Sequence, residues 1–265
     1  MSVTIKSTAE LDKMREAGRR LAQVHEELRA RVKPGMSTWE LDRIGEAKIR
    51  ELGCVPNFLD YHGYPASICI SVNDEVVHGI PKKEVLLQEG DMVSFDCGLI
   101  YHGYHSDAAR TYILGEGTEE QRKLVQVTRE SFFAGIKRAK AGCHLYDISA
   151  AIDDYISPYG YGIVRDLCGH GIGTELHEDP QIPNYRRKAK GVLLRQGMTL
   201  AIEPMVALGT WEVDMLDDGW TFVTADGSDA AHYENTIIIT DGEPEILTLT
   251  ETEKNGGIDI CIPII

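Results

Sequence analysis

The sequence lacks several features that define whole classes of protein. None of its six cysteines forms a C-x-x-C pair, which favours free thiols in a reducing cytoplasm over a disulfide framework or a zinc ribbon. No run approaches the ~18 apolar residues that a membrane span needs, and the polar first twenty residues contain no secretory h-region. These absences predict a cytoplasmic protein.

Positive charge is also scarce, because 27 Lys and Arg residues face 42 Asp and Glu residues, for a net charge of −15. This balance argues against nucleic acid or an anionic membrane as the main partner. The chain contains no low-complexity segment, and its Pro and Gly residues are scattered rather than gathered into a linker. With 43% hydrophobic residues, one compact domain over residues 1–265 is therefore expected.

Four helices are predicted from local signals. S/T-x-x-E/Q motifs begin at Ser7, Ser37 and Thr118, where the hydroxyl accepts from a first-turn N–H while the fourth side chain reaches back. Apolar residues at helical spacing follow the first and third of these motifs. A fourth helix is expected over about 145–156, and Pro158 stops it.

Segments with high β-propensity follow each pair of predicted helices. The first set is SICISVN, DMVSFDCGLI and DAARTYIL, and the second is GIVRDLC, GMTLAIEPMV, GWTFVTAD and HYENTIIIT. Five pairs of like residues also match at one fixed offset: Lys33 and Lys140, Gly35 and Gly142, Glu40 and Asp147, Leu41 and Ile148, Gly53 and Gly160.

This repetition has two interpretations, chance in helix-start chemistry or an internal duplication. Duplication predicts two similar halves, at about 1–117 and 118–250, followed by a short C-terminal tail. It also predicts that a functional site lies where the halves meet.

Two aspartates interrupt the apolar, β-prone stretch SFDCGLIYHGYHSDAART. A hairpin centred on residues 101–103 places Asp96 roughly opposite Asp107, at the 4.5–5.5 Å typical of cross-strand neighbours. Carboxylates that close in a partly apolar place cannot both stay ionised without help. They share a proton, one turns into solvent, or they bind a cation. A register slip of one residue would instead put them on different faces.

Three further residues sit in unusual surroundings. Glu203 lies in TLAIEPMV and Glu234 in HYENTIIIT, while His170 lies in the glycine-rich CGHGIGTELHE. Each alone has an ordinary structural interpretation, such as an edge position or a hydrogen-bonded buried histidine. Taken with the two aspartates, they form a set of four carboxylates and one imidazole, which suits Mn²⁺, Fe²⁺, Co²⁺ or Zn²⁺. Two divalent ions would balance the four negative charges.

These motifs, together with VVHGIP and YHGYPAS, resemble type I methionine aminopeptidases, from the first predicted helix to about residue 249. The resemblance implies an α+β pita-bread (creatinase/aminopeptidase-like) fold, in which a curved, mostly antiparallel sheet is backed by helix pairs in pseudo-twofold halves. The last fifteen residues carry no motif of use.

The resemblance also implies a dinuclear metal site between the halves. Asp96 would chelate one metal, Asp107 and Glu234 would bridge both, and His170 and Glu203 would complete the other. Cobalt, manganese, iron and zinc all remain open, and a monovalent cation is an additional candidate.

Roles in catalysis and substrate binding follow from the same resemblance. His78 is expected near the scissile amide nitrogen and His177 near the carbonyl oxygen, with Glu203 as the proton shuttle. The methionine pocket would draw on Tyr61, Tyr64, Cys69, Leu176 and Trp220. From their residue types alone, these five form a plain hydrophobic cluster.

The implied activity is removal of the initiator methionine from nascent proteins whose second residue is small, by attack of a metal-bridging hydroxide. The partner is then the N-terminal Met of a nascent polypeptide, with no nucleic acid or membrane bound directly. An association with the ribosome is compatible with this activity, and a monomer is expected from the family.

Two alternatives remain. A prolidase or proline-directed aminopeptidase shares the fold but usually carries a substantial N-terminal domain, whereas only helical chain precedes YHGYPAS here. A non-enzymatic peptide-binding relative has usually lost metal ligands. Three neighbours of the ligands depart from the family pattern, namely Ser106 for Gly, His232 for Gln and Asn235 for His. His102 and His105 lie near the hairpin but are not expected to be ligands.

Overall fold

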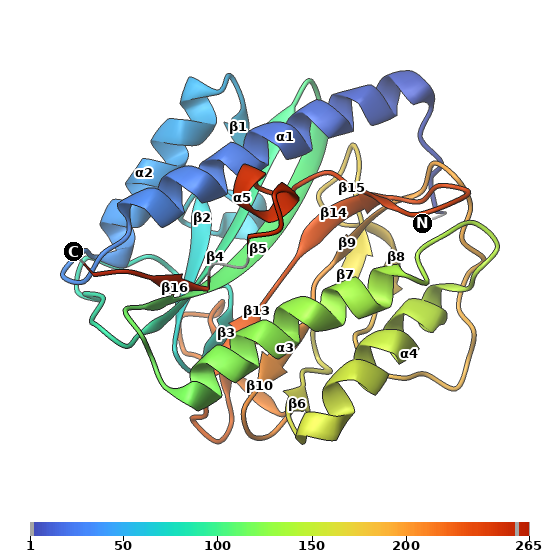
Figure 1. Cartoon of the computed structure of the whole chain (residues 1–265). Helices are drawn as coiled ribbons and strands as arrows, with labels where there is room; N and C mark the ends of the chain where they lie inside the picture. The colour runs from blue at the N-terminus through green and yellow to red at the C-terminus, as the bar shows by residue number, and fades with distance from the viewer. Residues whose placement is uncertain (1–2, 258–259, 265) are drawn as a thin grey trace.

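The computed structural model describes residues 3–257 and 260–264, and it contains helix pairs followed by strands in two successive rounds (Figure 1). The helices are α1 (Thr8–Arg31), α2 (Thr38–Glu51), α3 (Glu119–Ile136), α4 (Leu145–Ile156) and α5 (Glu251–Lys254), with 3₁₀ turns η1 (Tyr61–Gly63) and η2 (Ser157–Tyr159). The strands of the first round are β1 (Val55–Pro56), β2 (Ile68–Val72), β3 (Glu75–Val77), β4 (Met92–Tyr101) and β5 (Tyr104–Leu114).

None of the strands of the second round is longer than five residues. They are β6 (Gly162–Ile163), β7 (Gly169–Gly171), β8 (Glu178–Ile182), β9 (Thr199–Ile202), β10 (Met205–Ala207), β11 (Val213–Met215), β12 (Phe222–Thr224), β13 (Ala230–His232), β14 (Asn235–Ile238) and β15 (Glu245–Ile246). A final strand, β16 (Cys261–Ile262), returns to the first round.

The local helix signals are confirmed. The Thr118 hydroxyl accepts from the Gln121 amide at 3.1 Å, and the Ser37 hydroxyl accepts from the Glu40 amide at 3.2 Å. At the start of α1 the Glu10 carboxylate accepts from the Ser7 amide at 2.7 Å. The fourth helix has the predicted bounds, and the 3₁₀ turn that contains Pro158 follows it. These starts were predictable because a capping box depends on only four consecutive residues.

Two main sheets carry the fold. In one, β4 pairs with β5 on one side and with β1 and β2 on the other, while β16 adds to β5. The second has the order β15-β14-β9-β7-β8, and two three-stranded sheets (β13-β10-β6 and β11-β12-β3) complete the framework. The β5–β16 pair is parallel and the other recorded pairs are antiparallel, so the predicted α+β, mostly antiparallel architecture is confirmed.

The predicted internal repetition recurs in the backbone. An isolated antiparallel bridge joins Ser37 to Leu86, and another joins His144 to Leu193. The second pair lies 107 residues after the first at both positions (144 − 37 and 193 − 86), the same offset that relates Gly35 to Gly142. In both halves the residue that caps the second helix of the pair thus bridges to a segment 49 positions later (86 − 37 and 193 − 144).

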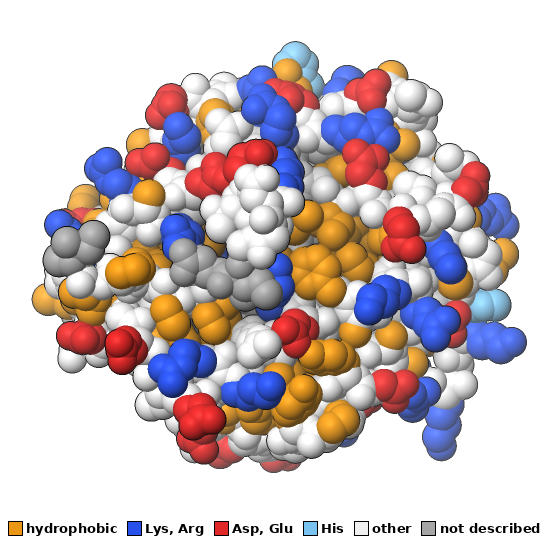
Figure 2. All heavy atoms as spheres, viewed as in Figure 1, with side chains coloured by type: hydrophobic (Ala, Val, Ile, Leu, Met, Phe, Trp, Pro, Cys, Tyr) orange, Lys and Arg blue, Asp and Glu red, His pale blue; other side chains and the backbone are white. Residues whose placement is uncertain are grey.

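The helix pairs cover the sheets on one side, with α1 and α2 over the first half and α3 and α4 over the second (Figure 1). One core lies under the first pair, around Leu21 and Phe95, and another lies under the second, around Phe132 and Ile237. Figure 2 shows this helical face, on which acidic and basic side chains are interspersed. No helix in the described residues is long and apolar enough to cross a membrane.

The halves meet where β5 runs beside residues 232–236, a contact called the seam below. The Glu234 amide donates to the Ala109 carbonyl at 3.0 Å, and the Ala109 amide donates back at 3.3 Å. The Thr236 hydroxyl accepts from the Asp107 amide at 2.9 Å and donates to its carbonyl at 2.8 Å. The seam therefore fixes two of the predicted ligands relative to each other.

Two strand predictions were too long. In GIVRDLC only Gly162–Ile163 pairs, because the chain leaves the sheet at the exposed residues Arg165 and Asp166. In GWTFVTAD only Phe222–Thr224 pairs. High β-propensity marks both segments, but the pairing ends where no neighbouring strand continues.

Candidate metal centre

Asp96 and Asp107 lie on the same face of the β4–β5 hairpin, but not directly opposite each other. The turn consists of His102 and Gly103, both with positive φ, and Tyr101 pairs with Tyr104. Asp96 therefore pairs with Ala109, which places Asp107 on the diagonal, two residues further along. Diagonal neighbours remain within interaction range on one face, so the correction to the register preserves the proximity.

The two glutamates lie at interruptions between strands rather than within strands. Glu203 follows the end of β9 and precedes Pro204, which has no N–H to donate to a ladder. Glu234 lies between β13 and β14. Because Asn235 pairs with Ile202, the two interruptions lie side by side. A local change in backbone direction thus lets both carboxylates face the same space.

His170 faces these carboxylates from β7. Its Nδ1 lies 2.9 Å from the Gly171 carbonyl, and its Nε2 lies 3.8 Å from Asp107 Oδ2 and 3.6 Å from Glu203 Oε1. Ligand atoms of Asp107, His170 and Glu234 all lie within 4.8 Å of one another, and all three residues are buried. The bond at Nδ1 leaves Nε2 as the nitrogen available to a ligand.

Burial and mutual repulsion raise the pKa of each carboxyl group in this cluster. Burial raises the pKa of Asp96 to about 7, although a hydrogen bond from Asp107 lowers it in part. The pKa values of Asp107, Glu203 and Glu234 are raised well above their usual range, first by burial and then by the charges of neighbouring carboxylates. Burial lowers the pKa of His170 to about 3, so its imidazole is neutral.

The donor set fits divalent metal ions. Among the described residues, the charged-group contacts of Asp107, Glu203 and Glu234 within 4.0 Å are to the neutral histidines His170 and His232 rather than to lysine or arginine. One buried oxygen of each of three carboxylates lacks a hydrogen-bond partner: Asp96 Oδ1, Asp107 Oδ1 and Glu234 Oε1. Buried unpaired carboxylate oxygens are costly unless they are protonated or bound to a cation. Oxygen atoms with one imidazole nitrogen are suitable ligands for borderline divalent ions.

The predicted site residues surround a single pocket of about 540 Å³. Its lining consists of Phe58, Tyr61, Tyr64, Cys69, His78, Asp96, Asp107, His170, Leu176, His177, Glu203, Trp220 and Glu234. All twelve residues named from the sequence are in this set, and Phe58 was missed. Phe58 could have been found as the aromatic residue three positions before Tyr61 in NFLDYHGY, but it lies outside the YHGYPAS motif.

The pocket has an acidic end and an aromatic wall. Tyr64 packs edge-on against Trp220 with ring centroids 5.2 Å apart, and its hydroxyl donates to the Gly79 carbonyl at 2.9 Å. The ring is therefore presented to the pocket while the polar end is satisfied behind it. Cys69 is buried, and burial raises the pKa of its thiol, which stays neutral.

Two histidines flank the acidic end. His78 has a positive φ of 59° directly after β3, and its ring packs edge-on against Phe222. His177 lies 4.3 Å from His170, ring centroid to ring centroid, and its Nδ1 is 2.7 Å from the Tyr61 hydroxyl. Both rings line the pocket beside the carboxylates, whereas His102 and His105 are absent from the described lining.

His232 belongs to this neighbourhood, although it was noted only as a departure from the family pattern. Its Nε2 lies 3.8 Å from Glu203 Oε2 and 4.0 Å from Glu234 Oε2. The side chain is buried, and burial lowers its pKa to about 3, so it is a neutral imidazole. Its position two residues before Glu234 could have indicated from the sequence that His232 lies close to the candidate ligands. Ser106 is fully buried, and nothing in the structure explains the serine there.

Comparisons with known proteins agree on one family. Residues 12–241 match the family described as metallopeptidase family M24. The chain is 52% identical, over 94% of its length and 100% of the relative, to a methionine aminopeptidase of Clostridium acetobutylicum. It is similar to the crystal structure of the Thermotoga maritima methionine aminopeptidase, with a TM-score of 0.91, 48% identity, and 94% and 100% of the two chains covered.

A more distant neighbour is a Xaa-Pro dipeptidase from Bacillus anthracis, with a TM-score of 0.77 and 25% identity. The superposition covers 97% of this chain but only 64% of the dipeptidase. The two proteins share the pita-bread architecture, and the dipeptidase has additional structure.

Proposed function

This chain belongs to metallopeptidase family M24, and from that membership we propose that it removes the N-terminal methionine from newly made polypeptides whose second residue is small. One observation carries the proposal beyond the family: a single pocket joins a metal-type donor set to an aromatic wall. The acidic end suits the amine and the scissile amide, and the aromatic wall suits a thioether side chain.

In this proposal the acidic end would hold two divalent ions. Asp96 would be a ligand of one ion, His170 and Glu203 would be ligands of the other, and Asp107 and Glu234 would be ligands of both. Two doubly charged cations offset four carboxylates, which supports this count. When bound, the ions supply Lewis-acid activation of the attacking water and of the scissile carbonyl. Manganese, iron, cobalt and zinc all accept these donors, and a monovalent cation elsewhere stays a prediction.

Glu203 is proposed to carry the proton from the attacking water to the leaving nitrogen. Burial, followed by the charge of Asp96, raises the pKa of Glu203 well above its usual range. A carboxyl group that binds a proton more tightly than usual is better matched to transfer near neutral pH. His78 lines the same pocket and is proposed to contact the departing amide nitrogen.

His177 is proposed to donate a hydrogen bond to the carbonyl oxygen as negative charge develops there. The Tyr61 hydroxyl, 2.7 Å from Nδ1, can donate to that nitrogen. This contact favours the tautomer in which Nε2 carries the proton. Tyr61 therefore orients His177 as a hydrogen-bond donor.

The aromatic wall is proposed to hold the methionine side chain, through Tyr61, Tyr64, Cys69, Leu176 and Trp220, with Phe58 as an addition. Methionine is unbranched, and its sulfur packs favourably on ring edges. The neutral thiol of Cys69 and the paired hydroxyl of Tyr64 present no charge to it. A charged or branched first residue would fit this wall less well.

Several finer features accompany the proposal. The whole chain, residues 1–265, would act as one catalytic domain with its site between the halves. The protein would work in the cytoplasm as a monomer on nascent chains, and contact with the ribosome would suit that task.

The test is an assay of Met-Ala-Ser hydrolysis by metal-free protein reloaded with Mn²⁺ or Co²⁺. Release of free methionine is expected, and chelation should abolish it. Leu-Ala-Ser and Ala-Pro serve as comparison substrates. Cleavage of Ala-Pro in preference to Met-Ala-Ser would establish the prolidase alternative. Protein that holds the metal yet cleaves none of the three would establish the peptide-binding alternative.

A further inference from the structure

The chain after β15 crosses the helical side of the seam and is called the C-terminal strap here, residues 247–257 and 260–264. It includes the short helix α5, which lies beside α1 (Figure 1), where the Glu251 amide donates to Glu26 at 2.7 Å. It ends in β16, whose Cys261 and Ile262 pair with Ile113 and Leu114 of β5. The strap follows residues 12–241, which match the metallopeptidase family model.

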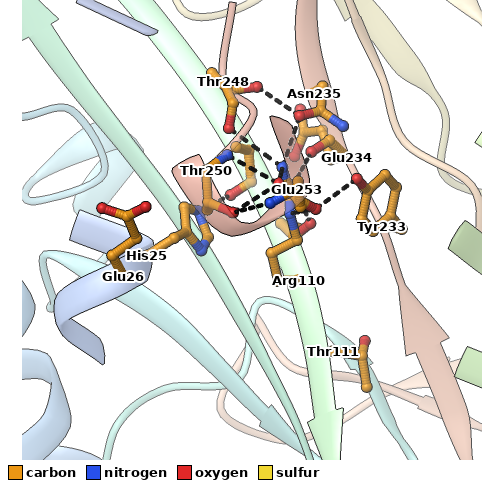
Figure 3. A network of polar contacts seen from close by, with 12 residues as sticks. His25, Glu26, Arg110, Thr111, Tyr233, Glu234, Asn235, Thr248, Thr250 and Glu253 are labelled. Carbon is orange, nitrogen blue, oxygen red and sulfur yellow. Dashed lines mark hydrogen bonds and ion pairs between the residues drawn. The ribbon is translucent and has the colours of Figure 1, made fainter. Parts of the chain in front are cut away.

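The strap inserts one carboxylate into the protein. Glu253 Oε1 and Oε2 accept from Arg110 Nε at 2.8 Å and Nη2 at 3.0 Å, a bidentate pair that Figure 3 shows. The Arg110 residue is 3% exposed, and the Glu253 side chain is 11% exposed. The Tyr233 hydroxyl and the Thr250 amide also donate to Glu253, at 2.7 and 2.9 Å. Both carboxylate oxygens are thus fully engaged.

Arg110 connects this carboxylate to the seam. Its Nη1 donates to the carbonyl oxygens of Ala109 and Glu234, and its Nη2 donates to Asn235 Oδ1 at 2.7 Å. Asn235 Oδ1 also accepts from the Thr248 hydroxyl at 2.8 Å, within the strap. One guanidinium therefore joins β5, the backbone and side chain at Glu234 and Asn235, and the strap. The Asn235 side-chain oxygen thus accepts two hydrogen bonds, one from Arg110 and one from Thr248.

The metal centre lies on the other face of the same strands. Side chains alternate between faces along an extended chain, so Asp107 and Arg110, three positions apart, point to opposite sides. Glu234 and Asn235, which are adjacent, do the same. The carbonyl that Arg110 binds belongs to Glu234 itself. A shift of Arg110 would therefore move the backbone of one candidate ligand relative to the other.

We propose that Glu253 is a positioning residue: through its ion pair with Arg110, the C-terminal strap fixes the spacing of Asp107 and Glu234 across the seam. This inference rests on the proposed metal centre, but not on the identity of the substrate. The strap stays outside the pocket and touches no reacting group. Its effect is on metal affinity and on turnover, through the two ligands whose strands it clamps.

The test compares Glu253→Gln with a matched control, Glu251→Gln. The first variant keeps the shape of the side chain but removes its charge from Arg110. The second makes the same change on the same helix, at a side chain that is 71% exposed. Mn²⁺ affinity is measured by calorimetry on metal-free protein, and kcat and KM are measured on Met-Ala-Ser, both well below the unfolding temperature.

Glu253→Gln is expected to weaken Mn²⁺ binding about 10-fold, the lower end of what loss of a supporting contact costs a metal site. Its kcat should fall while KM stays within about twofold of the starting value. Glu251→Gln should match the parent in every measurement. Arg110→Lys keeps the positive charge but loses the bidentate guanidinium. Its Mn²⁺ affinity should lie between those of Glu253→Gln and Glu251→Gln.

Parental Mn²⁺ affinity and kcat in Glu253→Gln, with only a lowered Tm, would overturn the proposal, because the strap would then be a stabilising element alone. If the parent protein binds Mn²⁺ but does not release methionine, the proposed function fails. The 10-fold loss of affinity in Glu253→Gln would still support the positioning role in that case.

Discussion

Both faces of the seam between β5 and residues 232–236 bury carboxylates, but the negative charges are balanced differently on the two faces. On the helical face, Glu253 meets the guanidinium of Arg110. Burial raises the pKa of Glu253, yet the charge and hydrogen bonds of Arg110 outweigh it and hold that pKa at about 2. On the pocket face, burial raises the pKa of Asp96 to about 7, and those of Asp107 and Glu234 rise well above their usual range.

This contrast separates a structural carboxylate from one arranged for a ligand. The helical face contains its own cation, so its ion pair is complete within the polypeptide. On the pocket face the carboxylates contact one another and neutral histidines. Charges so arranged require protons or bound cations. A raised pKa shared by several buried acids in a pocket is accordingly the stronger sign of a functional site.

The largest expected effect comes from Asp96→Asn. The substitution keeps the shape of the side chain but removes an anionic ligand, so kcat/KM on Met-Ala-Ser should fall by about 1,000-fold or more, beyond the 10–100-fold typical of a supporting residue. The metal-free variant should unfold about 2–4 °C above the parent at pH 8, because one repelling charge is gone. Activity and thermal unfolding are measured on the same preparation.

Near-parental kcat/KM in Asp96→Asn, with Mn²⁺ supplied, would remove Asp96 from the ligand set. A large drop in the Tm of the metal-free variant would indicate instead that the carboxylate is structural, like Glu253. Either outcome would contradict the distinction between a structural carboxylate on the helical face and ligand carboxylates on the pocket face.

Metal removal should make stability depend on pH in a defined direction. The pKa of Asp96 is about 7 in the folded protein, whereas that of an unperturbed aspartate is 3.8. A raised acid pKa favours the protonated form in the folded state, so its contribution is fully present below pH 3.8 and is lost as pH rises through 7. The loss amounts to at most about 4 kcal/mol for this group. The Tm increase on adding Mn²⁺ should therefore be larger at pH 8 than at pH 5, and a larger increase at pH 5 would contradict the assignment.

The sequence predicted those parts of the fold that depend on local chemistry. The capping boxes at Ser7, Ser37 and Thr118 needed only four residues each, and they set the helix starts correctly. The repetition was also visible in the sequence, because five pairs of like residues recur at the offset of 107 that relates the Ser37–Leu86 and His144–Leu193 bridges. The five candidate ligands were visible because four carboxylates and a histidine stand out in apolar or glycine-rich segments, whereas His78, His177 and the pocket residues were named only from the family resemblance.

The remaining features depend on long-range pairing. The register that sets Asp96 against Ala109 comes from the turn at His102, and a displacement of one or two residues was enough to misplace it. The interruption at Glu203 is set by which strand lies beside it. Glu253 lies 143 positions after Arg110 along the chain, and no local pattern encodes such a partner.

On the helical face, the contribution of Glu253 to stability should depend on pH in the direction opposite to that of Asp96. The pKa of Glu253 is lowered from 4.5 to about 2, so its contribution to stability is present above pH 4.5 and is lost as pH falls through 2. The full contribution is about 3 kcal/mol. The difference in unfolding free energy between the parent and Glu253→Gln should thus shrink between pH 4.5 and pH 2. The same difference for Glu251→Gln should stay near zero, and a pH-independent deficit in Glu253→Gln would contradict the ion-pair account.

The smallest expected effect comes from a residue at the edge of the pocket, because its substitution removes a hydrogen bond between neutral groups rather than a charge. Tyr61→Phe removes the hydroxyl that lies 2.7 Å from His177 Nδ1. A single hydrogen bond contributes about 1 kcal/mol, so kcat should fall about fivefold while KM changes little. Tyr155→Phe is the matched control, because its hydroxyl bonds to Glu130 of α3 and its side chain is not part of the pocket lining. That variant should lose about 1 kcal/mol of stability and keep its kcat. Equal kcat values in the two variants would mean that Tyr61 belongs only to the wall of the pocket and does not orient His177.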